Sequence, residues 1–413
     1  MSTLLLVWNY LKAKPLNTVL NIFLLALGIA VITILLLFSK QLEEKISINT
    51  KGIDLVVGAK GSPLQLILCN ILHLDFPTGN IKLIEAERLA KHRLIKNAIP
   101  LALGDSYQNF RIVGTSHSYA ELYGAELGLG RWWNEDLEVT IGATAASVLK
   151  LKIGVSFASA HGLVKDGHSH AENLYVVKGI LKPTNSVLDN LILTNVGSVW
   201  KVHDEPKEGQ QRDVEVSASP SPLVPMTMMG DSTREITALL IKYRNPLAVI
   251  QLPRLINSQT NMQAASPAFE MARLFSILGV GVDALMGFAY LLIFISALSI
   301  FIALYNSLKE RQYDLAIMRS MGASRGKLFF TTVMEGTSLT LAGSIMGFAL
   351  GHGALFAFTA LVEEGQKAGV SALVFYPQEA TVFAGSFALG IICSLIPAFQ
   401  AYRTDIHKVL AGN

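Results

Sequence analysis

The chain has 413 residues, of which 51% are apolar and 16% charged, and its mean hydropathy is +0.43. These values lie far on the membrane side of an average globular protein. The net charge of +3 is too small to indicate nucleic-acid binding, and no basic and aromatic stripe supports it. The two cysteines, Cys69 and Cys393, exclude a secreted fold held together by disulfides.

Four apolar stretches divide the chain unevenly. They cover about residues 16–38, 275–305, 329–361 and 380–399. Each is long enough for a helix that crosses a hydrocarbon core of about 30 Å. The first is too long for a signal peptide, and no small-x-small cleavage site follows it. We therefore expect one N-terminal and three C-terminal transmembrane helices, with a large extramembrane α/β domain between the first and second.

Positive charges near the ends of these stretches predict the orientation. They precede the first helix, fill the loop between the second and third, and follow the fourth: Lys12, Lys14, Lys309, Arg311, Arg319, Arg325, Lys327, Arg403 and Lys408. Lys40, Lys45 and Lys51 oppose this assignment, but long translocated domains carry little weight in the rule. Both termini are expected in the cytoplasm and the α/β domain outside.

Local patterns divide the α/β region into short elements. Strands are expected at 54–58, 109–114, 137–142, 174–181, 191–194 and 235–243, and helices at 81–96, 143–149 and 246–262. Residues 206–233 are rich in Ser, Pro, Gln and charge and predict a mobile loop. The expected domains are 1–40 with the first helix, 41–265 outside the membrane, and 266–413 with the other three helices.

Two C-terminal motifs carry a family resemblance. Residues 309–327 read KERQYDLAIMRSMGASRGK and resemble the RxxEIGxLRAxGAxxxxI loop of MacB/FtsX-like ABC transporter permeases, which include the MacB-type and lipoprotein-releasing permeases. Residues 397–405, PAFQAYRTD, look like the PAxxAxRxxP ending of that family, although Asp405 to His407 replace its final proline. The arrangement of helices around an outer α/β domain is also similar, so the resemblance covers essentially the whole chain.

The loop also has a physical interpretation. Leu308, Leu315 and Met318 share one helical face, Gly322 is suited to end the helix, and Ser324 is suited to cap the next one. Such a helix presses its apolar side either into a groove on a partner or onto lipid headgroups. The resemblance implies the first: a coupling helix at about 308–322 that is seated on the ATPase. The residues assigned to coupling are Arg311, Asp314, Leu315, Met318, Arg319 and Gly322.

Nucleotide binding is expected on a separate chain. The segment 322–327 lacks the four-residue gap before Gly-Lys, and the Ser or Thr after Lys, that define a phosphate loop. We therefore expect no catalytic residue and no cofactor in this chain, with ATP and Mg²⁺ bound by the ATPase subunit. No nucleophile–base pair indicates an enzyme.

The resemblance also implies partners and a location. It implies a second permease copy, identical or related, and a periplasmic adaptor or lipoprotein, in a bacterial inner membrane. The implied function is mechanical export or extraction of a peptide, hydrophobic compound or lipoprotein. The alternative is a regulatory permease that activates a periplasmic partner, such as a cell-wall hydrolase, without transport.

One histidine-rich segment departs from the family pattern. His161, His168 and His170 lie within ten residues, beside Asp166 and Glu172. Imidazoles and carboxylates suit Zn²⁺, so these histidines are a candidate metal site, which would indicate a zinc-linked transport component. The alternative is a solvated hairpin tip, where the same residue types are common.

Small residues line two of the apolar stretches. Gly343, Gly347 and Gly351 repeat every four residues, the spacing that lets two helix backbones approach closely. A second strip consists of Gly279, Gly281, Ala284 and Gly287. Packing within the bundle and a seam between two copies both fit this pattern.

Overall fold

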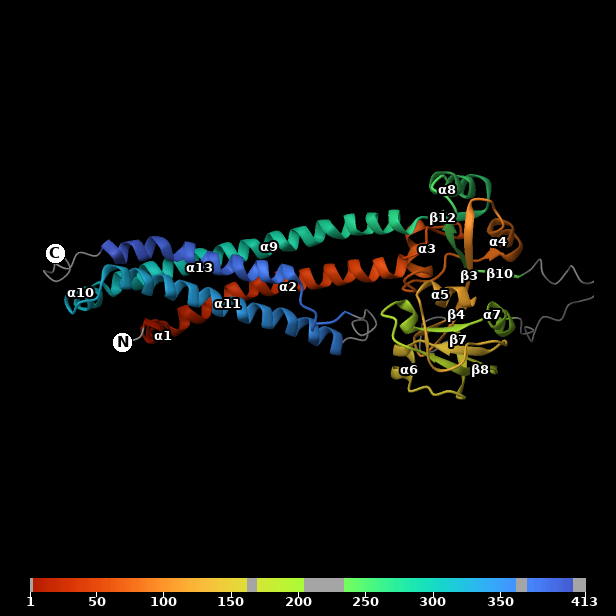
Figure 1. Cartoon of the computed structure of the whole chain (residues 1–413), viewed down its shortest axis with the longest axis horizontal. Helices are drawn as coiled ribbons and strands as arrows, with labels where there is room; N and C mark the ends of the chain where they lie inside the picture. The colour runs from red at the N-terminus through yellow and green to blue at the C-terminus, as the bar shows by residue number, and fades with distance from the viewer. Residues whose placement is uncertain (1–2, 162–168, 204–233, 362–369, 404–413) are drawn as a thin grey trace, which may run out of the picture. The chain divides into compact units, whose positions relative to one another are not determined.

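The computed structural model describes residues 3–161, 169–203, 234–361 and 370–403. The chain forms two compact units (Figure 1). Met1–Glu43 and Ile277–Asn413 make up one unit, called here the helical unit, and Glu44–Ser276 make up the other, called the α/β domain. The α/β domain is thus an insertion between the first long helix and the remaining three.

Across the described ranges, four helices are long and apolar enough to cross a membrane. They are α2 (Pro15–Thr50), α9 (Pro267–Glu310), α11 (Arg325–Leu361) and α13 (Pro377–Arg403). The predicted arrangement of one N-terminal and three C-terminal helices around an α/β domain is confirmed. Two short helices, α1 (Thr3–Ala13) and α10 (Gln312–Ser320), lie at the same end of the helical unit (Figure 1).

The glycine repeat of α11 packs inside the helical unit, against α2. A Cβ atom added at Gly343 would lie 2.9 Å from the Leu25 side chain, and one added at Gly347 would lie 2.7 Å from Ile29. Gly351 meets Thr33 in the same way, at 2.8 Å. The glycine repeat therefore serves the packing of α11 on α2 within the helical unit. The glycines of the second strip, on α9, have open space around them in the described part of the chain.

The α/β domain is built on a mixed sheet. Its strand order is β12-β1-β11-β3-β4-β9-β6-β8-β5, and β7 pairs with both β3 and β8. Most neighbours are antiparallel, but β4 pairs parallel with β9, and β6 pairs parallel with β8. The strands are β1 (Leu55–Ala59), β3 (Ile95–Tyr107), β4 (Phe110–Thr115), β5 (Leu127–Gly130), β6 (Glu138–Ile141), β7 (Ser156–His161), β8 (Ser169–Leu181), β9 (Leu191–Thr194), β11 (Ala238–Tyr243) and β12 (Met262–Ala265). A small second sheet pairs β2 (Ile81–Lys82) with β10 (Glu235–Ile236).

Two apolar clusters stabilise this sheet. One joins β1, β11 and β12 to α4 (Leu83–Ala90) and α8 (Ala248–Gln259). The other joins β4, β6, β8 and β9 to α6 (Ala143–Leu149). The remaining helices are α3 (Pro63–Asn70), α5 (His117–Leu122), the 3₁₀ turn η1 (Val187–Asn190) and α7 (Val196–His203). Burial of apolar side chains is the main stabilising contribution in both clusters.

Most of the expected elements are present, with three corrections. The strand expected at 235–243 divides into β10, in the small sheet, and β11, in the large one. The helix expected at 81–96 is wrong in extent, because β2 precedes α4 and the chain turns after Ala90 into β3. The helix expected at 246–262 ends at Gln259, and β12 returns to the sheet before α9 begins. The loop expected at 206–233 lies outside the described residues.

Candidate functional site

The segment between α9 and α11 has the local structure that its sequence predicts. Gly322 has a φ of +99°, a left-handed conformation that ends α10. The N–H of Gly322 donates to the carbonyl of Arg319 at 3.0 Å, and the N–H of Ala323 donates to that of Met318 at 3.0 Å. The Ser324 hydroxyl then accepts from the N–H of Lys327 at 3.2 Å and caps α11. The predicted helix end and cap are both confirmed.

The apolar face of α10 points into the helical unit, and this corrects the expected docking face. Leu315 is only 7% exposed and packs with Leu308 of α9, Leu328 of α11 and Ala401 of α13. Met318 packs partly buried against the same cluster. The expectation that Leu315 offers itself to a partner is wrong, because the ends of three long helices already cover it.

A different set of residues forms the accessible face of α10. Tyr313 is 58% exposed, Asp314 is exposed, and Met321 at the helix end is 76% exposed. Arg319 is half-buried, and Gly322 is exposed. The Tyr313 ring and the Met321 thioether are thus two large apolar side chains left exposed at this end of the helical unit.

Arg311 occupies the break between α9 and α10, and its side chain turns inward. Its guanidinium carbon lies 3.8 Å from the centre of the Tyr10 ring, and Nη2 donates to the Tyr10 carbonyl at 3.4 Å. Nη1 lies 3.6 Å from Oε1 of Glu335 on α11. Burial raises the pKa of the Tyr10 phenol, which opposes the effect of the neighbouring guanidinium. Arg311, assigned to coupling from the sequence, is thus an internal contact.

Glu335 and Tyr10 were missed as site residues by sequence reasoning. Glu335 could have been found from the sequence, because it is a carboxylate inside the apolar stretch 329–361. Ionisable groups in such helices usually have a partner and a function. No local pattern marks Tyr10, since its role depends on α1 meeting the start of α10.

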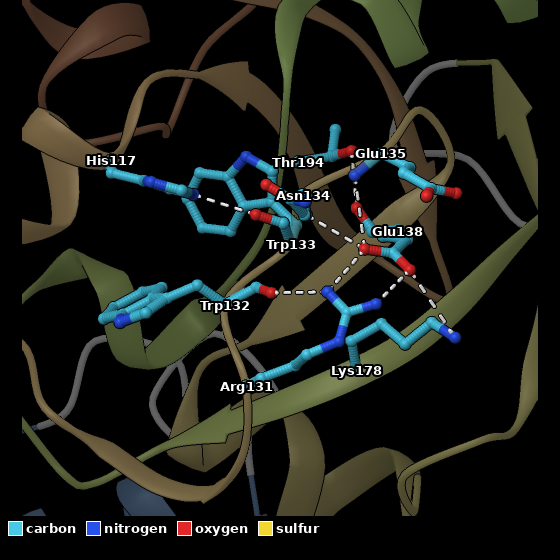
Figure 2. Close-up of polar contacts among 9 residues, drawn as sticks. All are labelled: His117, Arg131, Trp132, Trp133, Asn134, Glu135, Glu138, Lys178 and Thr194. Carbon is cyan, nitrogen blue, oxygen red and sulfur yellow. Dashed lines mark hydrogen bonds and ion pairs between the residues drawn. The ribbon is translucent and has the colours of Figure 1, made fainter.

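The α/β domain contains a second polar cluster, centred on Glu138 of β6 (Figure 2). Arg131 donates to both carboxylate oxygens of Glu138, at 2.8 and 2.5 Å. The backbone N–H groups of Asn134 and Glu135 donate to Oε2 at 2.9 and 3.2 Å, and Lys178 Nζ lies 3.5 Å from Oε1. The hydrogen bonds from Arg131 lower the pKa of Glu138 to about 2, and the backbone hydrogen bonds act in the same direction against burial.

This cluster fixes a loop and occupies the acceptor positions of Glu138 with donors from the protein itself. A carboxylate offers about four lone-pair positions, and Glu138 already faces five donors. The held loop carries Trp133, which is buried and whose carbonyl accepts a hydrogen bond from His117 at 2.9 Å. Figure 2 shows Arg131 and Lys178 both directed at the same carboxylate. The arrangement is structural, and it positions the loop between β5 and β6.

Two of the three candidate zinc ligands, His161 and His170, lie near the ends of β7 and β8. Ala160 of β7 pairs with Ser169 of β8, so the backbones of His161 and His170 lie near the same end of this strand pair. The side chains of both residues, and the whole of His168, lie outside what the structure describes. Elsewhere, no group of three His, Cys, Asp or Glu side chains in the described ranges is placed to hold a metal ion. The zinc site remains a prediction.

Comparison with known proteins finds matches for the C-terminal part of the helical unit. Residues 286–406 match the FtsX-like permease C-terminal family. The uncharacterized ABC transporter permease YknZ of Bacillus subtilis is 28% identical over 99 residues, which are 24% of this chain and 23% of YknZ. The uncharacterized ABC transporter permease MJ1507 of Methanocaldococcus jannaschii is 27% identical over 137 residues, 33% of this chain and 34% of MJ1507. The chain thus matches well under two thirds of the length of either relative.

Two solved structures resemble the α/β region at low scores. The periplasmic region of MacB from Actinobacillus actinomycetemcomitans aligns with 56% of this chain and 97% of its own, at 12% identity and a TM-score of 0.33. The extracellular domain of the noncanonic ABC-type transporter YknZ from Gram-positive bacteria aligns with 52% and 99%, at 11% identity and a TM-score of 0.29. At these scores neither likeness supports an inference about this chain.

The four apolar helices and the family match together define a class. The chain is a multi-pass membrane protein. It carries an FtsX-like permease domain and is homologous to ABC transporter permeases.

Proposed function

We propose that this chain is the permease subunit of an ABC transporter and that a separate ATPase subunit docks on α10. The observation that carries this proposal is the exposed face of α10, within the segment 286–406 that matches the FtsX-like permeases. Lys12, Lys14, Arg325 and Lys327 surround this end of the helical unit, which supports a cytoplasmic placement for it. Both termini then lie in the cytoplasm of a bacterial inner membrane, and the α/β domain lies outside.

The two faces of α10 have separate tasks in this proposal. Tyr313, Asp314 and Met321 contact the ATPase in this proposal, because they are accessible and include two large apolar side chains. Leu315 and Met318 fasten α10 to the ends of α9, α11 and α13, so they pass on its displacement. The coupling role assigned to Leu315 and Met318 is therefore transmission, without direct contact to the ATPase.

The lengths of α2 and α9 suit a mechanical role. These helices have 36 and 44 residues. At a rise of 1.5 Å per residue they extend about 54 and 66 Å, whereas the hydrocarbon core needs only about 30 Å. Both continue in sequence into the α/β domain, since β1 begins five residues after α2 ends and β12 ends just before α9 begins. ATP-driven motion would then reach the outer domain through continuous helices.

The outer domain is the part that would handle the substrate. We infer a peptide, a hydrophobic compound or a lipoprotein, moved or extracted outside the membrane with a second permease copy and a periplasmic adaptor or lipoprotein. The chain itself is a non-catalytic subunit in this proposal.

The test is co-purification of the tagged full-length chain in a mild detergent, followed by mass spectrometry. We expect an ABC ATPase with the wild type, and at least a tenfold loss of that ATPase with Tyr313→Asp combined with Met321→Asp. The matched control is Leu373→Asp, because Leu373 is 80% exposed between α11 and α13, at the other end of these helices.

The proteins that accompany the ATPase separate the possible functions. A periplasmic adaptor or lipoprotein supports transport, and a cell-wall hydrolase would support the regulatory alternative. Absence of any ATPase from the wild-type sample would overturn the proposal. Equal ATPase recovery with wild type and the α10 double variant would overturn the assigned docking face.

A further inference from the structure

Three side chains from three separate elements meet where α10 begins. Tyr10 belongs to α1, Arg311 joins α9 to α10, and Glu335 belongs to α11. The guanidinium of Arg311 contacts the face of the Tyr10 ring on one side and the Glu335 carboxylate on another. These contacts join the N-terminal helix α1 to helices from the last third of the chain.

The charged pair is well shielded from water. The side chain of Arg311 is 14% exposed and that of Glu335 is 11% exposed. Removing one member of a shielded pair leaves the other charge without a partner, which is much less favourable than replacing both. A planar guanidinium also stacks on an aromatic ring, which an ammonium group does less well. The pair therefore holds a defined geometry.

That geometry compensates for a break in the helix. Arg311 has φ −98° and ψ 12°, and α9 and α10 are separate helices on either side of it. A break of this kind is a place where two helices can change their relative angle. The contacts to Tyr10 and Glu335 fix α10 to α1 and α11 at this break.

A neighbouring ion pair offers a contrast. Lys14 lies between α1 and α2 and pairs with Glu310, the last residue of α9. Their side chains are 34% and 60% exposed. Exposed pairs contribute little to stability and are screened by salt. Glu310 is therefore a matched control for Glu335, one residue from Arg311 and carrying the same charge.

We propose that Arg311 and Glu335 are positioning residues that, with Tyr10, make α10, α1 and α11 move as one rigid body. Their importance for coupling rests on the proposed function, because a rigid connection matters for coupling only if the ATPase displaces α10. The rigid connection itself is a property of this chain alone and can be measured without an ATPase.

The experiment measures spin-label distances in the full-length chain in lipid nanodiscs. Cys69→Ser and Cys393→Ser remove the native thiols, and labels are attached at Ser320→Cys on α10 and Ile345→Cys on α11, both exposed positions. A narrow distance distribution is expected. Glu335→Gln should at least double its width, whereas Glu310→Gln should leave the width unchanged.

A double variant covers the case in which a single variant does not fold. Arg311→Met with Glu335→Gln leaves no unpaired charge, so it should fold at least as well as either single variant and still show the broad distribution. A distribution as narrow as that of the wild type in this double variant would overturn the proposal. Broadening by Glu310→Gln to the same width would also overturn it, since the effect would then not be specific to the shielded pair.

The two proposals fail in different ways. The Arg311 and Glu335 variants keep Tyr313 and Met321, so they should still recover the ATPase while losing its stimulation by the permease. Loss of the ATPase only in the Tyr313 and Met321 variant tests docking. A broad spin-label distribution in the double variant supports the rigid connection even if no ATPase is recovered.

Discussion

The helical unit and the α/β domain each place a glutamate against an arginine, but they do so differently. Glu138 in the α/β domain receives two hydrogen bonds from Arg131 and two from backbone N–H groups. Glu335 in the helical unit faces Arg311 at 3.6 Å, in a shielded site. Glu138 is held by its own local loop, whereas Glu335 depends on a residue that begins another helix.

The comparison extends to how the two units pack. The α/β domain buries large apolar clusters on its sheet, as a protein in water does. The helical unit also buries apolar side chains, but it adds close backbone approach at glycines and a few polar contacts, because burial from lipid provides little driving force between membrane helices. A larger side chain at a helix contact should therefore destabilise the helical unit most. A change of charge at Glu138, or of pH, should alter the stability of the α/β domain.

The largest expected effect comes from filling the contact between α11 and α2. Gly347→Leu places its side chain where a Cβ alone already lies 2.7 Å from Ile29 and 2.9 Å from the Ala26 carbonyl. We expect a loss of about 3 kcal/mol of stability, in the upper range for overpacked interiors. Thermal unfolding of the full chain in detergent measures it. Gly287→Leu on α9, where the added Cβ meets nothing within 4 Å, is the control and should leave the midpoint unchanged.

A smaller effect is expected at Glu138. Glu138→Gln should destabilise the α/β domain by about 2 kcal/mol at neutral pH, because a charged acceptor with several donors is lost. The pKa of Glu138 lies at about 2, below its ordinary value of 4.5. This depressed pKa favours the folded state above pH 4.5, and the contribution is lost as the pH falls from 4.5 through about 2.

The buried Trp133, close to Glu138, gives a fluorescence signal for unfolding by denaturant at each pH. The wild type should lose stability between pH 4.5 and 2, and the Gln variant should show a weaker dependence in that interval. Parallel pH profiles of the two proteins would show that Glu138 is not the group that titrates.

The smallest expected effect concerns zinc binding by the α/β domain. His161→Ala, His168→Ala and His170→Ala together should abolish zinc binding by the full chain in calorimetric titration, since imidazoles are preferred ligands. Folding should change little, because these positions lie at or beyond the ends of β7 and β8. Equal titrations of variant and wild type would exclude this site.

Local features were well predicted because their causes are local. The helix α6 begins and ends where its sequence indicates, at Ala143 and Leu149. Gly322 and Ser324 end one helix and cap the next through contacts within five residues. The four apolar helices follow from composition and length alone.

Features that depend on distant partners were predicted poorly. The strand β3 was missed, although it lies between β11 and β4, because Pro100 and Gly104 interrupt its alternation and its stability comes from both neighbours. The direction of Leu315 was also wrong. Helical spacing shows that Leu315 and Met318 share a face, but it cannot show which surface covers that face.

The sequence by itself determined the four apolar helices, the insertion of an α/β domain, the ends of α10 and the permease resemblance. Each of these depends on composition or on contacts within a few residues. Only the tertiary structure decided that Arg311 meets Glu335 and Tyr10, that the α11 glycines pack on α2, and that Tyr313 is accessible. Tyr10 and Arg311, and the glycines of α11 and the residues of α2, are separated by about three hundred residues. Such contacts are set by where the chain returns in space, which no local pattern reveals.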